Sequence, residues 1–270
     1  MSKYGEKQYD IDRPNPSVLF LKARDIAGIQ IQNQFFKLNK GITVKSSKDG
    51  FKWIKHELTY PSFDHLTFAF KNAIFSVVIE IVDNYQTSMT YNQKENLLKA
   101  ADQNNLIACV FKVRINNPQA DNPDLIPFNL EWNLFDILTG EEIYPEEIGN
   151  DIKTEMSKWE LNNFAIQIVR SDIEKNGGKI LSFCDVLEVN PQIWFSNKKD
   201  ERCWVIVRHI NRKEDGNQLE WVGLERKNEN LIPYDGFFAG VQFISIENNK
   251  LYRGDSMNAN YVGLKRIYVS

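Results

Sequence analysis

The sequence feature that most constrains the fold is a pair of apolar runs separated by a short charged turn, within Pro191–Ile210. The runs Ile193–Phe195 and Cys203–Ile210 flank the turn Ser196–Arg202, a pattern that predicts a β-hairpin entering a core. A fainter copy of the same pattern occurs upstream at Leu66–Ile81. We therefore interpret the chain as one small unit used twice.

Three blocks of sequence match in the same order in the two halves, with nearly constant offsets. They are Ile29–Ile31 with Ile166–Ile168, Phe75–Ile81 with Trp204–Ile210, and Leu106–Ile115 with Phe237–Ile246. Shared order and offset favour an internal duplication. It predicts that Phe75 superposes on Trp204 and Val110 on Val241. The alternative is that helix–hairpin–strand patterns recur in unrelated α+β proteins.

The remaining patterns predict helices and strands in both halves. Asn15-Pro16 can begin a first helix, and strands are expected at Leu106–Ile115 and Phe128–Leu138. Ser157 and Glu160 form a capping-box pattern that opens a helix in the second half. The face expected to be buried carries Leu161, Phe164, Ala165, Ile168 and Ile173.

The predicted fold class is α+β, with two tandem similar units, each a helix packed on a largely antiparallel β-sheet. The expected boundary is the acidic, Pro- and Gly-containing segment Glu141–Asp151. This places a first unit with an N-terminal arm at residues 1–145 and a second unit at residues 152–270.

Composition narrows the classes of function. The net charge of -3 gives no overall electrostatic case for binding nucleic acid or an anionic membrane. No run approaches the roughly 18 apolar residues of a membrane-spanning helix, and the N-terminus lacks the apolar region of a secretory signal. The three distant cysteines are typical of reduced thiols in an intracellular protein. We therefore expect a soluble cytoplasmic protein.

Familiar catalytic patterns are missing from the sequence. It contains no P-loop, no G-x-G-x-x-G and no G-x-S-x-G nucleophile elbow. Its three histidines share no metal-ligand spacing with each other or with a cysteine. We therefore expect no cofactor and no metal site.

One catalytic pattern remains as an alternative, the core of a metal-dependent nuclease. Asp64 and Glu80 have the outline of its two carboxylates, which would hold Mg²⁺. The lysine that should follow Glu80 by two residues is Val82, so Lys71 or Lys112 would have to substitute from another strand. The simpler interpretation is a turn residue, Asp64, and a solvent-facing strand residue, Glu80.

A basic segment, Lys45–Lys55, interleaves lysines with aromatic residues around a predicted Asp49-Gly50 hairpin turn. In such a pattern the lysines can bind phosphate groups while the aromatic rings stack on bases. A lysine-rich edge hairpin that resists aggregation has the same composition. The candidate binding residues are Lys45, Lys48, Phe51, Lys52, Trp53 and Lys55.

Taken together, these patterns favour a non-enzymatic intracellular protein that binds another protein, such as an inhibitor, an immunity protein or a chaperone-like protein. The alternative is a degenerate metal-dependent nuclease or a nucleic-acid-binding protein that uses Asp64, Glu80 and the basic hairpin. The expected partner is a protein rather than a nucleic acid, and no membrane is expected to take part.

Overall fold

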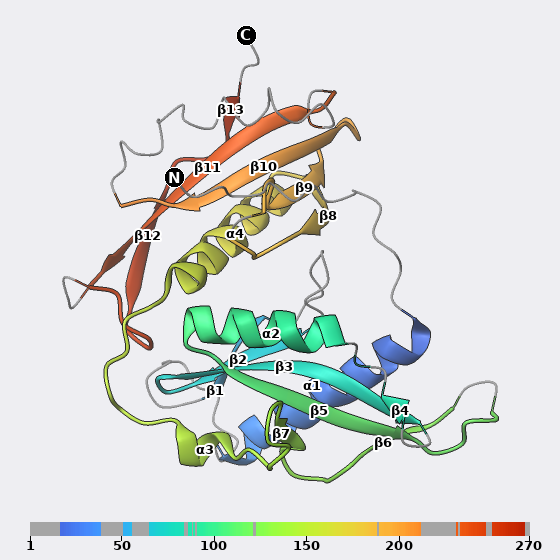
Figure 1. The fold of residues 1–270 in the computed structure, drawn as a ribbon. Coiled ribbons are helices and arrows are strands. Elements are labelled where there is room, and N and C mark those ends of the chain that lie inside the picture. The colour runs from blue at the N-terminus through green and yellow to red at the C-terminus, as the bar shows by residue number, and fades with distance from the viewer. Residues whose placement is uncertain are drawn as a thin grey trace.

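The computed structural model describes residues 17–38, 51–55, 65–83, 86–87, 89, 91–120, 123–187, 189–211, 231, 233–246 and 250–267. They form two β-sheets, one in each half of the chain, each with a helix packed on it (Figure 1). The predicted α+β class with two similar units is confirmed. The start of the first helix and the predicted hairpin turn at Asp49-Gly50 lie outside the described residues.

The first unit contains sheet A, with strand order β1-β2-β3-β5-β6, while β4 pairs with β3 and β7 with β5. Its strands are β1 (Phe51–Lys55), β2 (His65–Phe70), β3 (Ala73–Asp83), β4 (Gln86–Thr87), β5 (Ile107–Ile115), β6 (Leu125–Pro127) and β7 (Leu134–Asp136). Its helices are α1 (Val18–Leu38) and α2 (Tyr91–Asn104), and α3 (Pro145–Ile148) follows β7. The two long helices cover opposite faces of the sheet (Figure 1).

The second unit contains sheet C, with strand order β12-β11-β10-β9-β8, while β13 pairs with β11. Its elements are α4 (Lys158–Lys175), β8 (Lys179–Phe183), β9 (Ile193–Ser196), β10 (Arg202–His209), β11 (Asp235–Ser245), β12 (Met257–Tyr261) and β13 (Lys265–Ile267). Both predicted hairpins form, because β2 pairs antiparallel with β3 and β9 with β10.

The two sheets share one pairing scheme. Among the described strands, the central pair of each sheet is parallel, β3 with β5 and β10 with β11, and the other pairs are antiparallel. Phe75 lies beside Ile107, and Val205 lies beside Phe237. A single shift of 130 residues (205 − 75 and 237 − 107) therefore relates both central strands.

The residue matches predicted between the halves are wrong by one position. Phe75 faces α1, whereas Trp204 faces away from α4, so the equivalent of Phe75 is Val205. By the same shift, Val241 corresponds to Phe111 rather than to Val110. An error of one residue exchanges the two faces of a strand, because its side chains alternate.

Helix α4 begins with the predicted capping box. The Ser157 hydroxyl accepts a hydrogen bond from the Glu160 backbone N–H, and the Glu160 carboxylate accepts one from the Ser157 N–H. The predicted buried face is partly wrong, because Ile168 is only half-buried. Ile166 is fully buried in its place and packs with Val169 against sheet C.

The end of the first unit departs from the sequence prediction at one strand, and the segment after it contains a short helix. The strand expected at Phe128–Leu138 is confined to β7, and the expected boundary Glu141–Asp151 contains α3. Gly149 ends α3, where a Cβ atom would lie 2.8 Å from the carbonyl oxygen of Phe70. Only glycine therefore lets the chain pass this close to sheet A.

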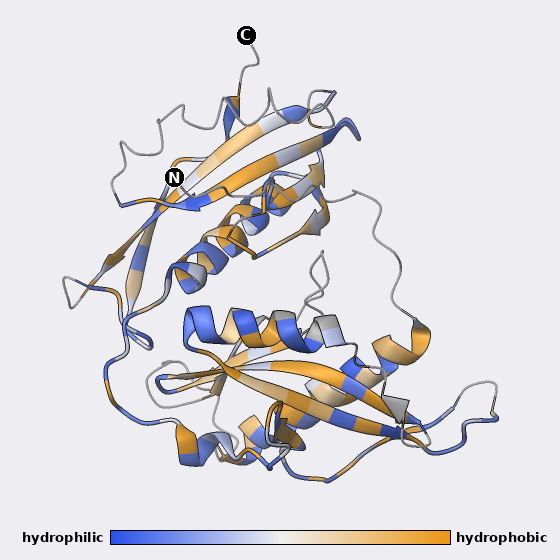
Figure 2. Ribbon diagram, viewed as in Figure 1, coloured by the Kyte–Doolittle hydropathy of each residue, from blue (hydrophilic) through white to orange (hydrophobic). Residues whose placement is uncertain are grey.

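Apolar residues concentrate along the central strands of both sheets, whereas α2 is largely hydrophilic (Figure 2). Helices α2 and α4 lie next to each other in the middle of the molecule, between the two sheets (Figure 1). The two units are therefore joined through the region between these helices.

Candidate functional site

The aromatic residues of the basic segment belong to the core of the first unit. Phe51 is buried and its ring stacks on Phe70 with 4.1 Å between centroids. The indole Nε1 of Trp53 donates a hydrogen bond of 2.7 Å to the Gln32 side chain on α1. Both rings also contact Phe35. Their positions explain why aromatic residues alternate along β1 without any need for base stacking.

The lysines of that segment are less fully described. Lys45 and Lys48 lie outside the described residues, and the structure describes Lys52 and Lys55 only as backbone positions in β1. Binding by these four lysines stays a prediction.

The structure brings together one part of the nuclease pattern. Glu80 on β3 lies beside Lys112 on β5, and Lys112 Nζ is 4.0 Å from Glu80 Oε2. Lys112 also lies over the Phe135 ring, 4.7 Å from its centroid. Lys71 is at the β2–β3 turn, where it pairs with Asp151 at 3.2 Å. Asp64 lies outside the described residues, and the described part of the chain contains no group of three side chains able to hold a metal ion.

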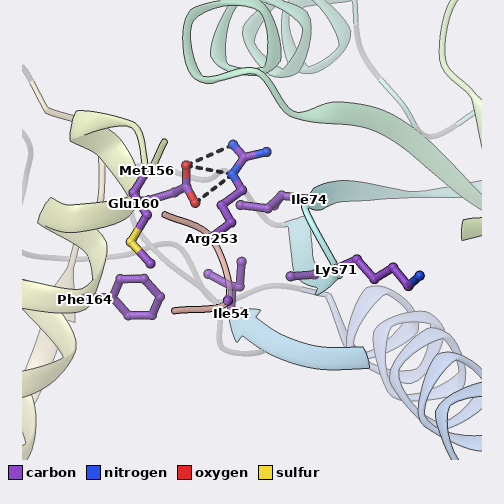
Figure 3. Close-up of a pocket in the computed structure, with 9 residues that line it drawn as sticks. Ile54, Lys71, Ile74, Met156, Glu160, Phe164 and Arg253 are labelled. Atoms are coloured by element: carbon purple, nitrogen blue, oxygen red, sulfur yellow. Dashed lines mark hydrogen bonds and ion pairs between the residues drawn. The ribbon is translucent and has the colours of Figure 1, made fainter. Parts of the chain in front are cut away.

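The junction between the units is built around Arg253, in the segment between β11 and β12 (Figure 3). Its guanidinium forms three hydrogen bonds of 2.9–3.1 Å with the Glu160 carboxylate, and both side chains are at least 95% buried. It also donates to the backbone oxygens of Asn72, Asn104 and Asn105. One side chain from the second unit therefore binds three backbone groups of the first.

Helix electrostatics favour this arrangement. Asn104 and Asn105 lie at the C-terminal end of α2, where unpaired carbonyl groups carry partial negative charge. Glu160 lies in the first turn of α4, where backbone N–H groups carry partial positive charge. The cationic guanidinium of Arg253 faces the carbonyl groups at the end of α2, and the carboxylate of Glu160 faces the N–H groups at the start of α4. Because every nitrogen of Arg253 has a partner, the residue joins the units rather than awaiting a ligand.

Apolar packing completes the junction. Trp159 at the start of α4 is buried against Ile54, Ala69 and Ile74, on the face of sheet A opposite α1. Beside this cluster is a cavity of about 10 Å³, lined partly by Phe164 and Met156 (Figure 3). Such a volume has room for about one water molecule. The cavity is too small to be a substrate site.

A larger hollow lies beside α4. It is an open groove of about 390 Å³ between this helix and strands β11 and β12. We call it the α4–β12 groove, and it is lined by Phe164, Gln167, Ile168, Ser171, Lys175, Phe243, Met257 and Ala259. Its volume is within the range of ligand-binding clefts, and its lining is mainly apolar.

Two rings support the floor of the α4–β12 groove. Phe164 and Phe243 meet edge to face with 6.4 Å between ring centroids, and His209 stacks on Phe243 at 5.7 Å. Burial lowers the pKa of His209, which favours the neutral imidazole. The groove therefore has an uncharged aromatic floor, with the cation Lys175 among its lining residues.

Sequence reasoning missed both the junction and the groove. Phe164 and Ile168 were expected in a core because their spacing is helical, yet both are half-buried beside open space. Arg253 stands in a segment without a recognisable motif. The one available signal was Glu160, a carboxylate predicted in the first turn of a helix.

Comparison with known proteins gives one match. A family model described as a domain of unknown function, DUF8840, matches residues 159–267, which run from the start of α4 to the end of β13. No curated protein and no solved structure matches the chain. None of the described helices is long and apolar enough to cross a membrane. The matched segment contains the whole α4–β12 groove and Arg253.

Proposed function

We propose that the chain is a non-enzymatic, cytoplasmic protein-binding protein of the inhibitor, immunity or chaperone-like kind. The observation that carries this proposal is the α4–β12 groove, an open apolar hollow with an aromatic floor. Exposed apolar hollows with a polar rim are typical of sites that receive the anchor side chains of a protein partner. The three cysteines are buried thiols, in keeping with a reducing compartment.

The occupant that best fits the groove is an extended segment of the partner. Strand β12 stands at the end of the described strand order of sheet C and lines the groove together with α4. An extended segment lying in the groove along β12 would place alternate side chains against Phe164 and Ile168. None of the ion pairs among the described residues includes Lys175, so an acidic residue in the segment would complement its charge.

The experiment is site-specific photocrosslinking followed by quantitative binding. A photoreactive amino acid replaces Ser171 in the groove or, as a control, Lys199 in the exposed β9–β10 turn. A partner trapped only from Ser171 is purified and titrated against wild type, Ile168→Asp and the control Ile29→Asp, an exposed isoleucine on α1. We expect Ile168→Asp to weaken binding by about tenfold or more, since a buried anchor contributes over 1 kcal/mol. Equal affinities for all three proteins would refute the groove as the site.

The same preparations test the nuclease alternative. Purified protein is incubated with supercoiled DNA, single-stranded DNA and RNA in the presence of Mg²⁺ or Mn²⁺. Cleavage abolished by Glu80→Ala would overturn the proposal. Nucleic-acid affinity that falls steeply with salt, and less steeply after all four lysines of the basic segment are changed to Gln, would do the same.

We also propose that the two units arose by internal duplication. The support is the shared pairing scheme and the single shift of 130 residues (205 − 75 and 237 − 107) that relates their central strands. A sequence profile built from relatives of residues 159–267 should then match residues 18–136 with the equivalences given above. A profile that aligns these strands with their faces exchanged would contradict a common origin.

A further inference from the structure

The first unit has an exposed surface that is both apolar and acidic. It is distant in sequence from the α4–β12 groove. We call it the Leu130 surface, formed by Phe128, Leu130, Glu131, Glu142 and Glu147. Leu130 is 81% exposed and Phe128 47% exposed, both large values for apolar side chains. The three glutamates are exposed as well.

The backbone beneath Leu130 is held in place by α1. Gln30 Nε2 donates to the carbonyl oxygens of Asn129 and Glu131 at 2.9 and 2.7 Å. Gln34 Nε2 donates to those of Leu130 and Glu131 at 3.2 and 3.0 Å. Four hydrogen bonds from a helix therefore fix a segment whose apolar side chain points to solvent. A fixed backbone lowers the entropic cost of binding.

The glutamates gather around the same segment. Glu142 accepts hydrogen bonds from the Asn129 amide at 3.0 Å and from the Tyr144 hydroxyl at 2.6 Å. The hydrogen bond to Glu142, with burial and the charges of Glu142, Glu131 and Glu147, raises the pKa of Tyr144 to about 12. The three carboxylates therefore lie around the Tyr144 hydroxyl. None of the ion pairs found in the described chain includes any of the three.

We infer that the Leu130 surface docks a basic segment of a partner protein, which places an apolar side chain against Leu130 and lysine or arginine side chains against the glutamates. Charge complementarity selects this occupant. A nucleic acid would be repelled by the carboxylates, whereas a cationic segment would supply the missing counter-charges. The inference extends protein binding to a second surface and does not depend on the groove.

The first test uses a short synthetic peptide rich in lysine and containing leucine, titrated against the full chain. Two further peptides replace its leucines by glutamine or its lysines by glutamate. We expect only the first peptide to bind well. Leu130→Ser should weaken it about tenfold or more, since the variant loses the apolar side chain that binding would remove from water. The matched control Val262→Ser, in the second unit, should leave the affinity unchanged.

The second test separates charge from shape. Glu131→Gln and Glu147→Gln should each weaken the lysine–leucine peptide by up to about fivefold and flatten its salt dependence, as expected for exposed ion pairs. Glu174→Gln at the end of α4 is the control. The inference is wrong if Leu130→Ser binds as well as wild type, or if the control reduces affinity as much as the two surface variants. It is also wrong if Ca²⁺ binds at the glutamates and displaces the peptide.

Discussion

At the scale of single residues, Arg253 shows how a buried charge can specify an arrangement. Removing a guanidinium and a carboxylate from water costs several kcal/mol for each ion, and their mutual attraction only roughly offsets that cost. The pair between Arg253 and Glu160 therefore contributes little net stability compared with an apolar contact. What it provides is a guanidinium that Glu160 holds in place and that also donates to three backbone oxygens of the other unit, those of Asn72, Asn104 and Asn105.

This view predicts unequal effects of single and double substitutions. Arg253→Met should reduce the free energy of unfolding by roughly 3–5 kcal/mol, because it leaves the Glu160 carboxylate buried without its counter-charge. Adding Glu160→Gln should recover part of the loss, since glutamine also serves in a capping box. Urea denaturation of wild type, both single variants and the double variant would measure this coupling. Strictly additive losses would contradict it.

At the scale of elements, helix α4 has two faces with different roles, one that packs on sheet C and one that lines the groove. Ile166 is fully buried against sheet C, whereas Ile168 lines the α4–β12 groove. Ile166→Ala should therefore reduce the free energy of unfolding by about 2–5 kcal/mol. Ile168→Ala should cost less than about 1 kcal/mol, close to the range of surface substitutions. Chemical denaturation of the two variants checks the assignment, and a reversed order of the losses would show that the faces are misassigned.

The sequence predicts those structural features that depend only on residues close together in the chain. Hairpins β2–β3 and β9–β10 and the capping box of α4 depend on neighbours in the chain, and all three are confirmed. The residue matches predicted between the two halves were wrong by one position. The correct shift follows from the parallel pairs β3–β5 and β10–β11, which join strands that are distant in sequence. Arg253 was missed because two of its acceptors lie 181 and 149 residues away. Periodicity identified apolar positions on α4 without showing which of them a neighbour covers.

At the scale of the whole molecule, the buried junction should make the two units unfold together. Trp159 belongs to α4 but is buried against sheet A, so neither unit keeps its full core alone. We expect a single transition in differential scanning calorimetry, with calorimetric and van't Hoff enthalpies that agree. Trp159→Ala should separate it into two transitions while leaving both sheets intact. Two separate transitions in the wild-type protein would contradict this coupling.

The same junction has a consequence for synthesis on the ribosome. All described strands of sheet A have been made once Asp136 is added, yet Trp159, which packs on the face at Ile54, Ala69 and Ile74, follows only later. At about 5–20 residues per second, the nascent chain would expose this apolar face for seconds. A stalled nascent chain that has emerged from the ribosome as far as Asp136 should therefore present a folded first unit prone to aggregation, and one that has emerged beyond α4 should not.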